Sequence, residues 1–164
     1  MEKNRPDTGN TPPDCFRLEE LEALQSVENQ TLVDVNYYLW LNQAETDEAP
    51  YRFLYYLELV FDDQSTLLLT SGDDSEAIRV SDAEALVKTA EALRRLHGKV
   101  IIQRVNAGNL PLWQGLVGQT LEAVRLSRNE EELYRNDALL LDFGDRKVLV
   151  QLSDKEGLLV GNWQ

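Results

Sequence analysis

The sequence predicts an α+β protein with antiparallel sheet, built as two tandem copies of one β-rich unit with a long helix between them. Three observations predict this fold: an internal repeat, strand-like segments separated by turn residues, and one clear amphipathic helix. The chain has 164 residues, of which 43% are hydrophobic, so it can form a packed core as one ordinary domain or two very small ones.

The internal repeat consists of two blocks in the same order. Residues 25–35 align without gaps with residues 114–124, and residues 57–63 align with residues 139–145. Further matches follow downstream: Leu67 with Leu149, Ser71 with Ser153, Ile78 with Leu158 and Val80 with Val160. Two collinear blocks indicate duplication more strongly than one. Matched apolar residues, such as Val35 and Val124, are therefore expected to face the same side of their sheets.

Each copy is expected to contain a short helical turn followed by four strands. The expected strands are residues 31–41, 51–61, 66–71 and 77–80 in the first copy, and residues 120–127, 137–143, 147–152 and 158–160 in the second. The turns at residues 62–64 and 144–146 use Asp, Gln and Gly, which suit tight connections. A short amphipathic helix over residues 17–25 precedes the first copy and has its glutamates away from the apolar stripe.

The clearest helix is predicted over residues 82–97, between the copies. Ser81 or Asp82 can cap its start, and Gly98 ends it. Its expected apolar stripe is Leu86, Val87, Ala90 and Leu93. A strand starting at Val100 follows. The expected organisation is a flexible tail over residues 1–15, the first copy over 16–80, a linking helix and strand over 81–108, and the second copy over 109–164.

Charge narrows the classes of partner. The formal net charge of −13 repels nucleic acid and anionic membranes, and it attracts a basic protein. Cys15 is the single cysteine, so neither an intramolecular disulfide nor a thiol zinc site is expected. The chain shows no signal peptide and no apolar run of the roughly 20 residues that a membrane span needs, so a cytoplasmic location is expected.

No motif predicts an enzyme, a cofactor or a metal site. His97 is the single histidine and is interpreted as a cation at the end of a helix rather than as a general base. Acidic clusters at residues 62–63 and 73–76 flank one strand of about 30 Å, so one cation cannot contact both. They, and the acidic residues 142–145 and 154–156 of the second copy, are interpreted as turns.

The aromatic residues concentrate between Tyr37 and Phe61, in the first copy. By alternation, the side chains expected to face the core are Val33, Val35, Tyr37, Leu39 and Leu41 in one strand, and Tyr51, Phe53, Tyr55, Leu57, Leu59 and Phe61 in the next. The opposite face carries the predicted partner-binding residues Tyr38, Trp40, Arg52, Tyr56 and Glu58. Either the long helix covers this face, or a partner or second subunit does.

The leading functional hypothesis is a non-enzymatic acidic binding protein, of the inhibitor or immunity type, that captures a basic partner or self-associates. The alternative is a small-ligand-binding protein or weak enzyme with a pocket between the two copies, and a third option is a purely structural subunit. A deep polar pocket at the junction of the copies would favour the alternative.

Overall fold

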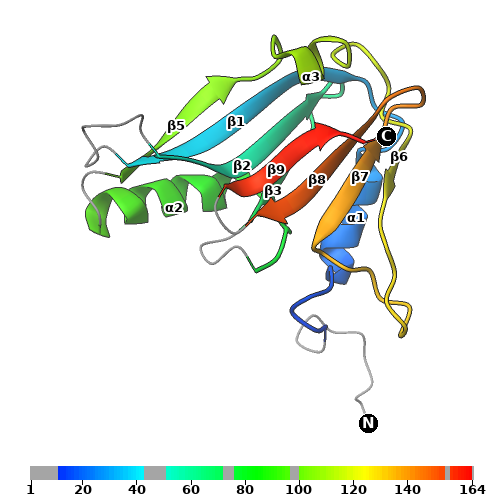
Figure 1. The fold of residues 1–164 in the computed structure, drawn as a ribbon, viewed down its shortest axis with the longest axis horizontal. Helices are drawn as coiled ribbons and strands as arrows, with labels where there is room; N and C mark the ends of the chain where they lie inside the picture. The colour runs from blue at the N-terminus through cyan, green and yellow to red at the C-terminus, as the bar shows by residue number, and fades with distance from the viewer. Residues whose placement is uncertain (1–10, 43–50, 72–75, 97–99, 154–155, 164) are drawn as a thin grey trace.

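The computed structural model describes residues 11–42, 51–71, 76–96, 100–153 and 156–163, which form a mixed α+β fold (Figure 1). Its helices are α1 (Leu18–Ser26), α2 (Ala83–Leu96) and α3 (Pro111–Gln114). Its strands are β1 (Leu32–Asn42), β2 (Tyr51–Phe61), β3 (Thr66–Thr70), β4 (Arg79–Ser81), β5 (Val100–Asn106), β6 (Ala123–Arg125), β7 (Ala138–Asp142), β8 (Lys147–Ser153) and β9 (Gly157–Asn162). All these strands belong to one curled, mostly antiparallel sheet.

The sheet consists of two antiparallel meanders. In the first meander, β1 to β4 pair in chain order, and β5 pairs with the other side of β1. In the second meander, β6 to β9 pair in chain order. The meanders meet at a parallel contact in which Leu54 of β2 lies opposite Gly157 of β9. The sheet therefore continues from one meander into the other.

Rows of paired residues cross the two meanders in similar registers. The paired rows are Val35, Leu59 and Leu67 in the first meander, and Val124, Leu141 and Val148 in the second. All six side chains pack in or against the main core. The predicted match of Leu67 with Leu149 is displaced by one residue, because the turn between β7 and β8 is one residue shorter than the turn between β2 and β3.

The starts of the two meanders are joined around an antiparallel bridge between Thr31 and Thr120. Hydrogen bonds from amide to carbonyl cross the junction in both directions: Leu32 to Gln119 at 2.9 Å, Leu121 to Gln30 at 2.9 Å, Asn29 to Leu121 at 2.6 Å and Gly118 to Leu32 at 2.7 Å. Asn29 and Gly118 both have positive φ, 71° and 96°, a conformation that Asn and Gly tolerate better than other residues. The two sides of this junction thus make the same contacts.

A second junction lies at the beginning of β9 and of β4. The amide of Leu54 donates to the carbonyl of Glu156 at 2.9 Å, and the amide of Ile78 donates to the carbonyl of Asn136 at 2.9 Å. In the first bond, a residue of β2 contacts the residue just before β9. In the second bond, the residue just before β4 contacts a residue that precedes β7. The two junctions close the meanders around a common interior.

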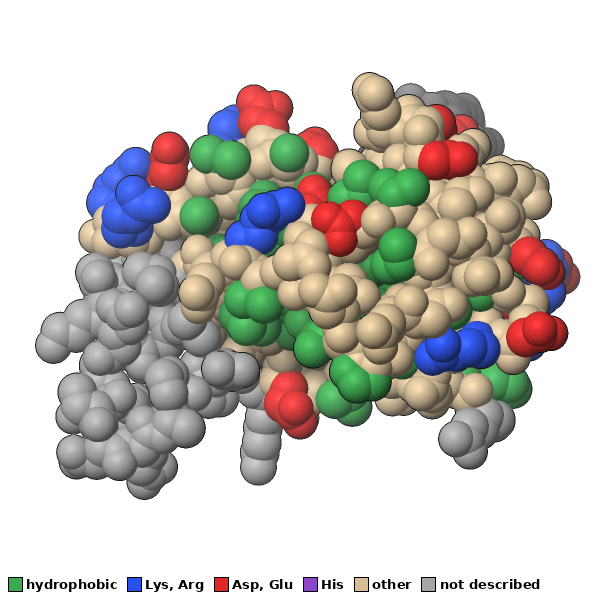
Figure 2. All heavy atoms as spheres, turned by 90° about the horizontal axis from the view of Figure 1, so that it is seen from above, with side chains coloured by type: hydrophobic (Ala, Val, Ile, Leu, Met, Phe, Trp, Pro, Cys, Tyr) green, Lys and Arg blue, Asp and Glu red, His purple; other side chains and the backbone are tan. Residues whose placement is uncertain are grey.

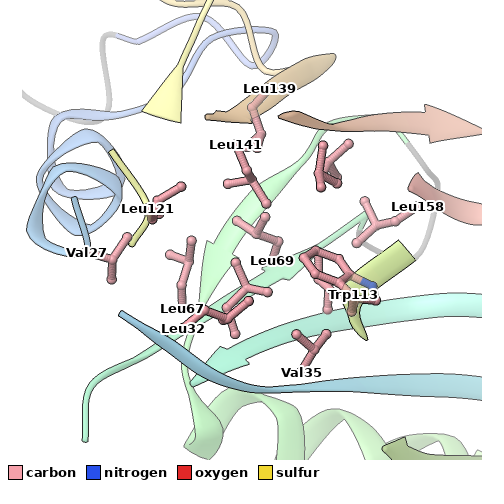
Figure 3. Packing of buried hydrophobic residues seen from close by; sticks show 14 of the residues in the cluster. Val27, Leu32, Val35, Leu67, Leu69, Trp113, Leu121, Leu139, Leu141 and Leu158 are labelled. Atoms are coloured by element: carbon pink, nitrogen blue, oxygen red, sulfur yellow. The ribbon is translucent and has the colours of Figure 1, made fainter. Parts of the chain in front are cut away.

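The main hydrophobic core fills this interior (Figure 3). It draws on both meanders, and its fully buried members include Leu32, Leu59, Leu121 and Leu141. Trp113 of α3 is also fully buried, and its indole nitrogen Nε1 donates a hydrogen bond of 2.7 Å to the Tyr37 hydroxyl. The indole N–H is therefore satisfied inside the core, where an unpaired donor would be costly.

Two register shifts change which side chains of β1 and β2 face the core. A shift between Leu32 and Asp34 inserts Val33, which is 43% exposed although alternation placed it inside. A shift opposite Tyr38 and Leu39 inserts Tyr55 in β2. A bulge reverses the alternation of the strand beyond it.

The bulge at Tyr55 makes the prediction for the first half of β2 wrong. Leu54, predicted to face outward, packs in the main core, whereas Phe53 and Tyr55 pack on the outer face. Leu57, Leu59 and Phe61 do lie in the main core. The side chains of Leu41 and Tyr51, two further predicted core residues, lie outside the described residues.

The N-terminal helix is held by a buried carboxylate rather than by its apolar side alone. Glu20, predicted to lie away from the apolar stripe, is 3% exposed. Its Oε1 atom accepts hydrogen bonds from the Arg17 amide at 2.8 Å and Arg79 Nη1 at 2.9 Å. Its Oε2 atom accepts from the Val80 amide at 3.0 Å. Glu20 thus fastens α1 to β4.

Residues 13–15, assigned from sequence to the tail, contact the second meander. The Asn136 amide donates to the Asp14 carbonyl at 3.1 Å, and Asn136 Nδ2 donates to the Pro13 carbonyl at 2.9 Å. Cys15 is fully buried. Burial, followed by the charge of Asp14, raises the pKa of its thiol.

Candidate binding surface

The predicted partner-binding residues lie on the outer face of the first meander, on the side of β1 and β2 away from the main core. Tyr38 lies directly opposite Tyr56, with ring centroids 6.4 Å apart in an edge-to-face arrangement. Tyr38, Trp40 and Glu58 are half-buried, while Tyr56 is 4% exposed. The side chain of Arg52 lies outside the described residues.

The helix α2 accounts for the burial of Tyr56. Leu86 of α2 packs with Phe53, Tyr55, Tyr56 and Leu68 in a second hydrophobic cluster, against which Tyr38, Trp40 and Ile102 are packed. The predicted cap at Asp82 is present, because its Oδ1 atom accepts a hydrogen bond from the Ala85 amide at 2.8 Å.

The predicted stripe of α2 is divided between two sides of the helix. Leu86 is buried, whereas Val87 is 55% exposed and points away from the cluster. The side chain of Leu93 lies outside the described residues, as does His97. The helix therefore covers Tyr56, whereas Tyr38 and Trp40 pack against the same cluster and stay half-buried.

Aromatic contacts hold this cluster together. The Trp40 ring lies 5.3 Å from the Phe53 ring and 6.0 Å from the Tyr55 ring, measured between centroids. Tyr55 and Tyr56 are 5.2 Å apart, because the bulge turns both side chains to the same face. Phe53 and Tyr55 were missed as members of this face, since strict alternation placed them inside.

A polar network adjoins the aromatic cluster. Glu58 Oε1 accepts hydrogen bonds from Asn36 Nδ2 at 2.9 Å and from the Tyr38 hydroxyl at 3.3 Å. Asn106 Nδ2 donates to Asn36 Oδ1 at 3.2 Å and to Asp34 Oδ1 at 2.8 Å. Asn36 is 1% exposed, and the two polar residues Asp34 and Asn36 within a largely apolar strand were the signal that could have revealed this network.

The Tyr38 hydroxyl lies between opposite charges. Burial, followed by the Glu58 carboxylate, raises the pKa of Tyr38, and Arg104 on β5 opposes this effect. The phenol is therefore a neutral hydrogen-bond donor near pH 7. An aromatic ring and a carboxylate side by side suit the side chain of a lysine or arginine.

Two of the acidic residues interpreted as turn residues have local hydrogen-bond partners, Asp63 in the turn after β2 and Asp142 at the end of strand β7, while residues 73–75 and 154–155 lie outside the described residues. Asp63 Oδ1 accepts a hydrogen bond from the Ser65 amide at 2.9 Å, and the Ser65 hydroxyl, followed by the Ser65 amide, lowers the pKa of Asp63. Asp142 accepts from the Gly144 amide at 2.8 Å and from Arg125 Nε at 2.7 Å, and these bonds lower its pKa. Among the described residues, no group of three or more His, Cys, Asp or Glu side chains is placed to hold a metal ion.

A small cavity lies between α1 and the segment around β6. Its volume is about 240 Å³, and it is lined mainly by apolar side chains, including Leu21, Leu24, Val124 and Tyr134. Its acid, Glu28, already accepts a hydrogen bond of 2.8 Å from the Val124 amide through Oε2. The cavity is smaller than a typical ligand pocket, and it lacks several free polar groups pointing into it.

Charges of both signs occur on the surface. Figure 2 shows acidic, basic and hydrophobic side chains in separate small groups on the face seen from above. On this face the acidic excess is thus spread out rather than gathered in one patch. In the described part of the chain, every helix is too short or too polar to cross a membrane.

Comparisons of this chain with protein-family models, with curated protein sequences and with solved structures find no match.

Proposed function

We propose that this protein is a non-enzymatic binding protein that captures a basic protein partner through the edge of the β1–β2 outer face. The observation that carries the proposal is the half-buried set of Tyr38, Trp40 and Glu58, which presents aromatic rings beside a carboxylate at the margin of α2. Such a set favours a lysine or arginine side chain through ion pairing and cation–π contact. The net charge of −13 would speed the encounter.

Tyr56 contributes to this proposal as a support rather than as a contact. At 4% exposure it lies beneath α2, so its removal would leave a cavity and cost about 3–5 kcal/mol. Trp40→Ala and Glu58→Gln are therefore the informative single substitutions. Leu18→Ala is the matched control, because Leu18 is 53% exposed on α1, which lies at the opposite end of the molecule from α2 (Figure 1).

The test begins with affinity capture from the source cell and measures the Kd of the purified captured protein. We expect a basic partner, about tenfold weaker binding for Trp40→Ala and for Glu58→Gln, and unchanged binding for Leu18→Ala. Affinity should fall as salt is raised, since charge contributes. Wild-type affinity in both test variants, with melting temperatures intact, would refute the proposal.

We also propose that the two meanders are copies of one ancestral unit. The matched blocks of sequence, the similar pairing registers and the reciprocal hydrogen bonds around Thr31 and Thr120 support a common origin. Outside the shared meander, β5 and α2 belong to the first unit alone. The aromatic binding face is thus a feature of one unit rather than of the common fold.

A further inference from the structure

The outer face of the second meander carries an apolar strip formed by Leu140, Leu149, Leu159 and Trp163. Leu140 lies opposite Leu149, which lies opposite Gly161, and Leu159 lies two pairs further along, opposite Gln151. Leu159 is 42% exposed and Trp163 is 49% exposed. A hollow of about 210 Å³ adjoins the strip, lined by Leu140, Leu149 and Trp163 together with Arg125. We call the four apolar residues Leu140, Leu149, Leu159 and Trp163 the open strip.

The corresponding face of the first meander is covered by a helix. By pairing register, Glu58 and Leu68 stand where Leu140 and Leu149 stand in the second meander. Leu68 is 2% exposed because Leu86 of α2 packs in the same cluster. No described helix crosses the front of β7, β8 and β9 (Figure 1), and α1 packs on the core side. The open strip is therefore the counterpart of a helix-covered surface.

The dimensions of the strip also suit a helix. Three neighbouring strands span about 10 Å at roughly 4.8 Å per strand, close to the diameter of an α-helix with its side chains. Gly161 leaves open space at the centre, because a Cβ atom there would meet nothing within 4 Å. A large apolar side chain of an incoming helix can fill this gap between Leu149 and Trp163.

The charges beside the strip indicate the polar character of the occupant. Asp142 is shared by Arg125 at 2.7 Å and Lys147 at 3.7 Å, so two cations face one carboxylate. The side chains of Arg125 and Lys147 are 61% and 30% exposed. In a chain of net charge −13, these three side chains together carry one net positive charge. Carboxylates flanking the apolar stripe of a helix would pair with these cations.

We propose that the open strip docks an amphipathic helix of a partner protein whose apolar stripe is flanked by acidic residues. This inference rests on the pairing registers and exposure of the second meander, and it concerns a surface separate from the β1–β2 face. A second copy of the chain fits the strip less well. Two copies would carry the same net negative charge, which opposes their association.

The test uses two synthetic amphipathic peptides with the same leucine stripe, one flanked by glutamates and one by lysines. Binding is measured by fluorescence anisotropy of the labelled peptides added to the full chain. We expect the glutamate peptide to bind about tenfold more tightly than the lysine peptide. Leu159→Glu should weaken its binding about tenfold. Val33→Glu is the control, because Val33 is 43% exposed on a different strand.

Thermal melts check that the variants remain folded, and Trp163→Ala replaces Leu159→Glu if the latter does not fold. Equal binding of the two peptides, or no binding near 1 mM peptide, would overturn the proposal. The proposal also fails if the wild type elutes as a dimer that Leu159→Glu converts to a monomer, because a second copy would then occupy the strip. None of these outcomes depends on Trp40 or Glu58, so the proposed basic-partner surface is tested independently.

Discussion

Replacing Gly157 by alanine should disrupt the contact that joins β2 to β9. Gly157 has φ of 78° and lies opposite Leu54, and an added Cβ would collide with the Leu54 carbonyl oxygen. That oxygen belongs to the backbone, so a side-chain rotation cannot relieve the collision. The strands must separate, which strains the neighbouring hydrogen bond from the Leu54 amide to the Glu156 carbonyl.

The expected loss of stability in Gly157→Ala has two causes. Placing alanine in the left-handed region costs about 1–2 kcal/mol, and the collision with its repacking adds about 1–3 kcal/mol. Gly157→Ala should therefore lower the free energy of unfolding by about 2–5 kcal/mol. For a chain of this size, this corresponds to a fall in melting temperature of about 4–20 °C.

Gly118→Ala separates the two costs. Gly118 also has positive φ, 96°, but an added Cβ there meets nothing within 4 Å. Gly118→Ala should lower the free energy of unfolding by only about 1–2 kcal/mol, the cost of the left-handed backbone conformation. Urea unfolding of the wild type and both variants gives the comparison. If Gly157→Ala is no more destabilising than Gly118→Ala, the close approach of β9 to Leu54 is wrong.

Three other predictions concern buried ionisable groups. Glu20→Gln should lower the free energy of unfolding by about 2–4 kcal/mol in urea melts, because Arg79 loses its buried partner, and an unchanged midpoint would contradict this role. The depressed pKa of Asp142 stabilises the fold above the ordinary carboxyl pKa. The stability gap between wild type and Asp142→Asn should shrink as the pH falls below about 4, and a gap constant from pH 7 to pH 3 would oppose it. Cys15 should react slowly with iodoacetamide at pH 8 and rapidly in urea, since burial raises its pKa, and fast labelling of the folded chain would refute this.

Features set by short stretches of sequence could be predicted well. The helix between the meanders follows from its apolar spacing and from Asp82 at its start, and both features are local. The strands β2, β3, β7 and β8 were also found, because strand-like runs meet at tight turns. The mixed α+β class followed from these elements.

Features set by contacts between distant segments could not be predicted. The bulge at Tyr55 depends on how β2 meets β1, and one inserted residue moved Phe53 to the outer face and Leu54 to the core. Glu20 looked like a solvent-facing residue because its partner Arg79 lies 59 positions away. For the candidate surface, sequence placed Tyr38, Trp40 and Glu58 on one face but left open whether the long helix or a partner covers it, and the packing of α2 on Tyr56 favours the helix for that residue.

The bridge between Thr31 and Thr120 also constrains how the chain reaches its native state. These residues are 89 positions apart, and the core they help to close takes side chains from both meanders. During synthesis, the first meander therefore emerges before the residues that complete its interior exist. Closure of so long a loop carries an entropic cost that only the assembled core offsets, so folding should be slow and cooperative. Until the second meander is made, the apolar core face of the first meander would need protection from association with other chains.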